Sequence, residues 1–272
     1  MSKWEILLKH SDMILVGFRN TLILFSVSAV AAFLLSAAIV LAIQTRRGVV
    51  SSSIRAIVDG MRMLPFLMYA YILYYGLPSL GISMDAWTVG FISLITYHGA
   101  YFAEILRGAW ATLSTGQAES ARAHGFTSLG MYRRILLPQL VLRTAPVLGN
   151  QLIICLKDTA FLSIITVREL TSAAASVQSM YFIPFEAFIV AIGLYWVTSI
   201  LIELLVARFG FVAPILIDGD GTIIAGHGRF EAAQLGLLLR DDRKGLPQGR
   251  TGGVQQLVID PRGLSELLPD WK

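Results

Sequence analysis

Three ionisable side chains stand inside otherwise apolar runs of this chain: His98, Lys157 and Asp158. An ionisable group within an apolar run of membrane length is costly unless the protein buries or pairs it, so each is a candidate functional residue. A histidine in such a helix can be a proton or ligand site, or it can hydrogen-bond a neighbouring helix. No second ligand is evident for His98, so a hydrogen bond to another helix is the favoured interpretation.

Lys157 and Asp158 are adjacent, and two neighbours on a helix point in different directions. Each is therefore expected to pair with another helix or with a backbone group. An ion-pair anchor between helices and a contact with a transported substrate are two interpretations of equal weight.

Several tyrosines crowd the apolar run that precedes His98. An aromatic belt at the membrane interface is the favoured interpretation for Tyr74 and Tyr75. Tyr69 and Tyr71 are candidates for lining a translocation path.

No set of catalytic residues is evident in the sequence. A phosphate-binding Gly-x-x-x-x-Gly-Lys-Ser/Thr motif is absent, so the chain is not expected to hydrolyse ATP by itself. Neither a Ser/His/Asp set nor a cluster of metal ligands is evident. The single cysteine, Cys155, lies in an apolar segment, which argues against a disulfide framework and a cysteine-based metal site. We expect a protein that is not an enzyme and binds no cofactor or metal of its own.

The elements that must position these residues are membrane helices. Hydrophobic residues make up 55% of the chain and charged residues 15%, whereas a soluble domain carries about 25% charged residues. The net charge of +4 comes with basic residues that cluster in loops between apolar runs, as membrane orientation predicts, so no nucleic-acid partner is expected. Lys3 and Lys9 precede a first apolar run that is too long for a signal peptide.

The expected fold class is all-α integral membrane with about five transmembrane helices, followed by a short α/β or disordered tail. Pro65 should kink the second helix. The expected spans are residues 13–43, 57–81, 86–105, 145–166 and 185–206.

The longest polar interruption between these runs is residues 116–143, GQAESARAHGFTSLGMYRRILLPQLVLR. A helix can begin at Ser114 or Gly116, and Gly125 stands where a glycine that ends a helix would. A second helix can begin at Thr127 or Ser128 and should stop or kink at Pro138. The pattern predicts two short helices around a glycine, a shape that could dock a soluble partner.

This stretch resembles the cytoplasmic loop of ABC importer permeases, whose pattern is Glu-Ala-Ala, three residues, Gly, about nine residues and Ile-x-Leu-Pro. A serine replaces the middle alanine here, and the flanking glutamines are similar to the polar amino-acid branch. The residues that carry the match, and that the resemblance assigns to the coupling of an ATPase, are Gln117, Glu119, Ala121, Gly125, Ile135, Leu137 and Pro138.

Four further segments resemble the same family: GFRNTLIL from Gly17, RMLPFLMYAYILYYGLP from Arg62, TYHGAYFAEILRGAW from Thr96 and the run containing LKDTAFL. The resemblance implies the type I importer permease fold over residues 1–209. It implies that a separate ATPase dimer uses ATP, that an extracytoplasmic binding protein delivers substrate, and that a second permease copy or a paralogue completes the path. The surrounding partner is membrane lipid.

The distribution of Lys and Arg sets the expected orientation. Loops 44–56 and 107–143 carry the basic residues and should face the cytoplasm, which places the N-terminus outside and the C-terminus inside the bacterial inner membrane. Glu104 and Arg107 can pair on one helix face near this boundary.

After residue 209 the composition shifts abruptly to a near-neutral, polar segment. Residues 214–237 predict strand, Asp-Gly turn, strand, glycine turn and helix. Residues 223–233, IIAGHGRFEAA, resemble the start of a ParB-like nuclease-type domain. The match ends near Leu237, so residues 210–240 are interpreted as a partial domain and residues 241–272 as a disordered tail.

Two classes of function follow. The first is the permease subunit of an ATP-driven importer of polar amino acids or similar small solutes. The alternative is an ion-driven secondary transporter or channel, in which His98 or the Lys157–Asp158 pair relays the ion. A third, minority interpretation builds a membrane-tethered nucleic-acid enzyme on the tail.

Overall fold

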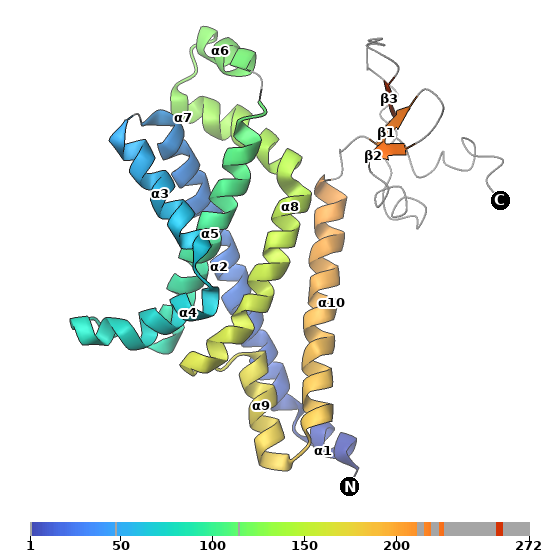
Figure 1. The fold of residues 1–272 in the computed structure, drawn as a ribbon. Helices are drawn as coiled ribbons and strands as arrows, with labels where there is room; N and C mark the ends of the chain where they lie inside the picture. The colour runs from blue at the N-terminus through green and yellow to red at the C-terminus, as the bar shows by residue number, and fades with distance from the viewer. Residues whose placement is uncertain are drawn as a thin grey trace, which may run out of the picture. The chain divides into compact units, whose positions relative to one another are not determined.

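The computed structural model describes residues 2–46, 48–113 and 115–210, together with three short strands at 215–218, 223–225 and 254–257. The chain divides into two compact units, residues 1–203 and 204–272. The first unit is built of helices, with α6 and α7 at one end and α1 and α9 at the other (Figure 1).

The helices follow one another along the chain without a strand between them. The α-helices are α1 Lys3–Lys9, α2 Ser11–Thr45, α3 Val49–Met63, α4 Phe66–Tyr71, α5 Ala86–Trp110, α6 Thr115–Ala123, α7 Ser128–Met131, α8 Leu137–Asp158, α9 Leu170–Tyr181 and α10 Pro184–Gly210. Two short π-helices, η1 Ile72–Gly76 and η3 Tyr132–Leu136, and two 3₁₀ helices, η2 Leu77–Leu80 and η4 Thr159–Ile165, join some of them.

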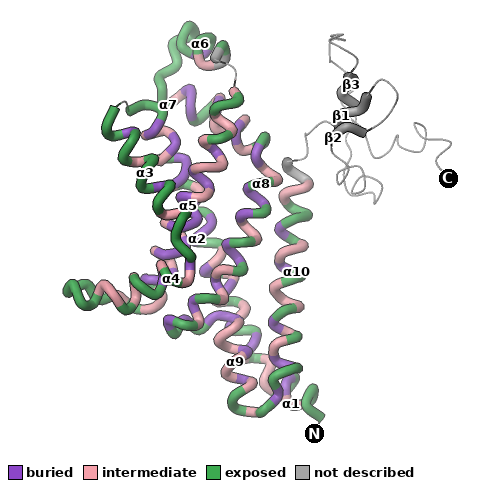
Figure 2. Tube along the Cα trace, in the orientation of Figure 1, coloured by how far each residue is buried: buried purple, intermediate pink, exposed green. Residues whose placement is uncertain are grey.

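The predicted all-α membrane architecture is confirmed. Four helices within the described residues are long and apolar enough to cross a membrane: Ser11–Thr45, Ala86–Trp110, Ser128–Ile165 and Pro184–Ala207. A fifth crossing results if α3 and the segment from α4 to η2 are taken as one broken span. The buried residues gather where these helices face one another, while α6 and much of the segment after α4 are exposed (Figure 2).

Helix α2 packs closely against α5 and α9. A side chain at Gly99 of α5 would come within 2.9 Å of Leu35 on α2, and one at Gly17 of α2 would come within 2.5 Å of Ala173 on α9. The Thr21 hydroxyl accepts a hydrogen bond from the backbone N–H of Leu170, at 3.0 Å, and so satisfies a donor in the first turn of α9. Small residues therefore let these helices approach as they commonly do in membranes.

The second predicted span, residues 57–81, is not a single helix: α3 ends at Met63, and a separate helical segment begins at Phe66. Leu64 takes an extended conformation ahead of Pro65, because a proline disfavours the helical conformation of the residue before it. The expected kink is there, but it is a bend of 103° between α3 and the segment that follows.

Two tyrosines of α5 satisfy the backbone at this bend. The Tyr101 hydroxyl donates to the carbonyl of Arg62, and the Tyr97 hydroxyl donates to the carbonyl of Leu64, each at 3.0 Å. Backbone carbonyls left open in an apolar medium cost several kcal/mol each, so these hydroxyls make the break tolerable.

The fourth span also begins earlier than predicted. The helical run does not stop at Pro138 but continues from Ser128 to Ile165. Pro138 lies in the first turn of α8, directly after the π-helical turn η3. In this turn the hydrogen-bond pattern shifts, with the Leu137 N–H donating to the Tyr132 carbonyl, and such a shift accommodates a following residue that has no N–H. The second helix of the loop and the fourth span are thus one continuous element.

In the second unit, β1 Ile215–Asp218 pairs antiparallel with both β2 Ile223–Ala225 and β3 Val254–Leu257. The two predicted strands are confirmed and pair antiparallel, while residues 219–222 between them lie outside the described residues. Strand β3 was not expected, because it falls in the range interpreted as a disordered tail. The predicted glycine turn and helix after β2 lie outside the described residues.

The bend yields a stability prediction. Replacing Tyr101 by Phe should lower the free energy of unfolding by about 1 kcal/mol, since the Arg62 carbonyl loses its donor in a partly buried setting. The matched control is Tyr71→Phe, because the Tyr71 side chain is exposed and makes no hydrogen bond within the described residues. Thermal unfolding in detergent micelles measures both variants, and equal losses would show that the hydroxyl at the bend is not the cause.

Candidate functional site: the docking loop and a buried polar contact

The loop between α5 and α8 folds as two short helices around a glycine, as predicted. Helix α6 ends at Ala123, and Gly125 adopts a left-handed backbone with φ of +78°. The N–H of Gly125 donates to the carbonyl of Arg122 and the N–H of Phe126 to that of Ala121, at 2.9 and 3.1 Å. These two bonds form a Schellman motif, which closes the C-terminus of α6.

The second helix starts at the predicted residue. The Thr127 hydroxyl accepts a hydrogen bond from the Gly130 N–H at 3.2 Å and caps α7. The alternative starts for the first helix were Ser114 and Gly116; Ser114 lies outside the described residues, and the helix begins at Thr115. A side chain at Gly125 would meet no atom of the chain within 4 Å, so only backbone strain opposes it there.

The base of the loop is fixed to the membrane helices. The buried Tyr132 donates its hydroxyl to the carbonyl of Ala37 on α2 at 2.8 Å, and its ring lies 5.7 Å from that of Trp110 at the end of α5. Ala121 and Met131 are buried in the same apolar cluster, beside Phe102 of α5. The loop is thus braced by α2 and α5 rather than hanging free.

The residues predicted for coupling divide between the surface and this base. Glu119, Gly125 and Pro138 are exposed, whereas Ala121 packs inward and Ile135 and Leu137 are half-buried against the same cluster. The side chain of Gln117 lies outside the described part of the chain. The exposed Glu119, Gly125 and Pro138 therefore remain the candidates for direct contact with a partner, and the three inward-facing positions hold the loop in shape.

A surface hollow of about 480 Å³ opens at the glycine. Phe126 and Leu129 contribute exposed apolar surface to it, and the exposed Arg133 and Arg134 contribute positive charge. None of these four residues was among those predicted for coupling. The sequence held a signal for them, because it places apolar side chains next to two adjacent arginines in a polar loop, and exposed apolar side chains in such a loop often mark a binding surface.

In the middle of the helical unit, His98 of α5 meets α8. His98 is fully buried; its Nδ1 lies 3.0 Å from Gln151 Nε2, and its Nε2 lies 3.3 Å from Asp158 Oδ2. The favoured interpretation of His98, a polar contact with a neighbouring helix, describes this arrangement. Gln151 was not predicted as its partner, and Asp158 was not predicted to face it.

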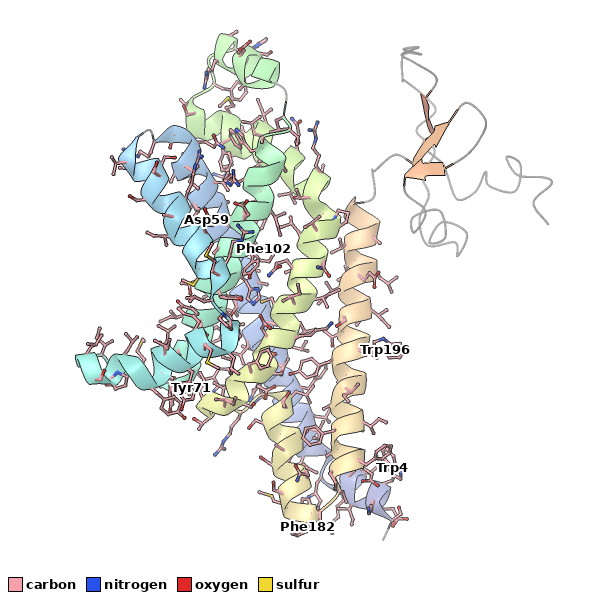
Figure 3. All side chains as sticks on the ribbon, in the orientation of Figure 1. Trp4, Asp59, Tyr71, Phe102, Phe182 and Trp196 are labelled. Carbon is pink, nitrogen blue, oxygen red and sulfur yellow. The ribbon has the colours of Figure 1, made fainter. Side chains whose placement is uncertain are left out.

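Lys157 lies apart from this contact. It lines a hollow of about 320 Å³ with residues of α10 that include Tyr195, Trp196 and Ser199 (Trp196 is labelled in Figure 3). Lys157 is exposed and forms no salt bridge within the described residues. Lys157 and Asp158 therefore face different parts of the protein, as expected for two neighbours on a helix.

The candidate tyrosines also separate. The Tyr69 hydroxyl lies 2.8 Å from the Thr96 hydroxyl of α5, and its ring stacks against Tyr97. Tyr71 is exposed and packs on Tyr75 with ring centroids 4.5 Å apart. Tyr69 thus belongs to the helix packing, and Tyr71 to the free surface of the segment beyond the bend (Figure 3).

The predicted Glu104–Arg107 pair is confirmed within α5 and extends to a second helix. Arg107 Nη2 lies 2.6 Å from Glu104 Oε1, and Arg62 Nη1 of α3 lies 3.6 Å from the same oxygen. These charges join α3 to α5 near the docking-loop end of α5. No group of three or more metal-ligating side chains exists among the residues the structure describes.

The sequence of the helical unit matches a known family model. The model of the binding-protein-dependent transport system inner membrane component matches residues 14–211. The chain belongs to this family. It is a membrane-spanning permease of the ABC importer class, and the match ends close to the start of the second unit.

Relatives and solved structures agree with this assignment. The chain is 30% identical to the probable glutamine ABC transporter permease GlnM of Bacillus subtilis (strain 168), over 72% of this chain and 91% of that protein. It is 29% identical to the nopaline transport permease NocM of Agrobacterium fabrum, over 77% and 96%. A crystal structure of an amino acid ABC transporter with histidines superposes with a TM-score of 0.67 and 28% identity, over 75% of this chain and 95% of that one.

Proposed function

We propose that this chain is the permease subunit of an ATP-driven importer of polar amino acids or similar small solutes. The observation that carries the proposal is the braced loop of residues 116–138, whose exposed hollow at Gly125 offers a docking surface for a separate ATPase. The family assignment and the two curated relatives support the transport of small nitrogenous solutes.

The mechanism follows from how the loop is anchored. Because Tyr132 and Met131 lock the loop base to α2 and α5, a push on α6 and α7 moves helices rather than deforming the loop. Closure of an ATPase dimer would then tilt α5 and α8 and switch the side to which the path opens. ATP is bound and hydrolysed by the partner, and this chain supplies the path and the coupling.

The path itself needs further partners. A binding protein on the outer face would deliver substrate, and a second copy of this chain or a paralogue would complete an enclosed path, since four or five spans enclose too little. Lys157 and Asp158 are candidates for contact with substrate, and membrane lipid surrounds the whole. No nucleic-acid partner is proposed.

One observation favours the second candidate function, an ion-driven transporter. The buried contact of His98 with Asp158 is the kind of pair that relays protons in membrane transporters. That alternative gives the docking loop no partner, so the loop variants below discriminate between the two functions.

Gly125→Val tests the coupling role. The valine should strain the left-handed backbone by about 1–2 kcal/mol and place a branched side chain in the space a partner would occupy, so uptake and co-purification of the ATPase should both fall. Gly48→Val is the control in another loop: Gly48 also has open space around it, and its φ of +68° with ψ of −138° is a conformation that favours glycine even more strongly, so the strain of the control is at least as large. Glu119→Lys should act like Gly125→Val, less severely.

The readout of these variants is paired: uptake of candidate amino acids, and association of the ATPase, at equal membrane abundance. If Gly125→Val kept full uptake and full ATPase association, the coupling role of the loop would be wrong. Equal losses in Gly125→Val and Gly48→Val would attribute the effect to backbone strain alone.

Orientation is a separate expectation. We propose that residues 44–56, 107–143 and 208–272 face the cytoplasm and that the N-terminus lies outside the inner membrane. With Cys155 replaced, Ser128→Cys should resist a membrane-impermeant thiol reagent in intact cells and react after lysis, since residue 128 is exposed on the loop. Labelling of this cysteine in intact cells would reverse the orientation.

We also propose that residues 212–272 are an appendage that transport does not need. The family match ends at residue 211, and the resemblance of residues 223–233 to a ParB-like domain covers too few residues for an independent core. Truncation after Phe211 should leave uptake unchanged. Loss of uptake at normal membrane abundance would give the second unit a role in transport.

A further inference from the structure

We propose that His98, Gln151 and Asp158 form a proton-binding site that links α5 to α8. The three side chains stand inside an otherwise apolar contact between these helices. His98 is fully buried, Gln151 is 6% exposed, and the Asp158 side chain is 13% exposed. This inference goes beyond ATP-driven transport and does not depend on which solute is carried.

The two contacts of the ring together indicate which nitrogen of the neutral ring carries the proton. Gln151 Nε2 faces His98 Nδ1 at 3.0 Å, and in that orientation of the amide Nδ1 accepts and is bare. Asp158 Oδ2, which can only accept when the carboxyl is ionised, faces the other nitrogen, so the proton belongs on Nε2. That nitrogen is buried without a well-aligned hydrogen bond, and Asp158 Oδ2 lies 3.3 Å from it. The ring therefore presents an N–H toward a carboxylate.

The same side chains can hold one more proton. If the Gln151 amide turns over by half a rotation, its oxygen faces Nδ1 and accepts a hydrogen bond from a protonated nitrogen. The doubly protonated ring then has an amide oxygen on one side and a carboxylate on the other. Neither state requires the helices to move, so the site can exchange a proton in place.

Among the described residues, the His98 ring is the only side chain that can pair with Asp158 as a cation. Phe66 of α4 covers the ring at 6.0 Å, and η4 contains no ionisable residue. The other titratable groups near the site are Tyr97, whose ring stands 5.4 Å from His98, and Cys155 and Lys157 of α8. Lys157 is adjacent to Asp158 in the sequence but lines the hollow beside α10 and makes no salt bridge with Asp158.

Other charged residues of the packed elements lie elsewhere. On α2 the ionisable residues are Asp12 and Arg19, both near its N-terminus. On α3, Arg62 pairs with Asp59 and with Glu104 of α5. A carboxylate inside an apolar bundle without a cation is costly, so protonation of His98 should stabilise the pairing of α5 with α8.

The position of the site gives it a consequence for coupling. Helix α5 leads into the docking loop and α8 leads out of it. A proton bound between them would tie the two helices together, and its release would ease their relative movement. This consequence rests on the proposed function, whereas the proton site itself does not.

Nitrogen NMR of the full chain in lipid bilayers, labelled with ¹⁵N-histidine, tests the site. The chain has four histidines, and His98→Asn assigns the resonances. At pH 8 the wild-type ring should carry its proton on Nε2 with Nδ1 bare, and at pH 5 both nitrogens should be protonated. In Asp158→Asn the second proton should be lost at pH 5. His124, exposed on the loop, is the internal control and should respond equally in both proteins.

Three results would overturn the proposal. The first is a wild-type ring that stays neutral at pH 5, the second is an Asp158→Asn ring that gains the second proton as the wild type does, and the third is a neutral ring with its proton on Nδ1. The first and third are read on the wild-type protein alone, so they stand even where the variant fails to fold. Failure of the uptake variants at Gly125 would leave this test unaffected.

Discussion

The close packing of α2 on α5 is the contact on which the helical unit depends. Gly99 lets the two backbones approach until a side chain there would touch Leu35. From this pair, α9 is held through Gly17 and Thr21, and the docking loop is held through the bond of Tyr132 to Ala37. Because lipid offers no hydrophobic drive between helices, such close fits and internal hydrogen bonds decide which helices stay together.

The same apolar solvent explains where hydroxyls are placed. Every break in a helix must find donors or acceptors inside the protein. Tyr97 and Tyr101 do this at the bend before Pro65, and Thr21 does it at the start of α9. At the loop the Schellman bonds around Gly125 do it with backbone alone. Most polar side chains at these breaks are thus structural, whereas His98 Nε2 is one of four buried side-chain atoms in the described residues that lack a hydrogen-bond partner.

The sequence predicted local features well and distant pairings poorly. Gly125 and Thr127 were read correctly because a helix end and a helix start depend on a few neighbouring residues. The contact of His98 with Gln151 and Asp158 joins residues more than fifty positions apart, and no local signal reports it. For the same reason the pairing of β3 with β1 was missed. Pro65 predicted a kink, but no local signal predicted a bend of 103° or the tyrosines of α5, 33 and 39 positions away, that bond to its backbone.

The helical run from Ser128 to Ile165 has a consequence for how far a movement of the loop can travel. Its 38 residues follow one another without a loop, so no flexible connection separates the docking loop from Asp158 at the end of α8. The run bends on its way (Figure 1), and it contains Pro146, whose missing N–H removes one hydrogen bond from the helix interior. A displacement of α7 therefore reaches the far end through connected helical segments and not as the tilt of one straight helix.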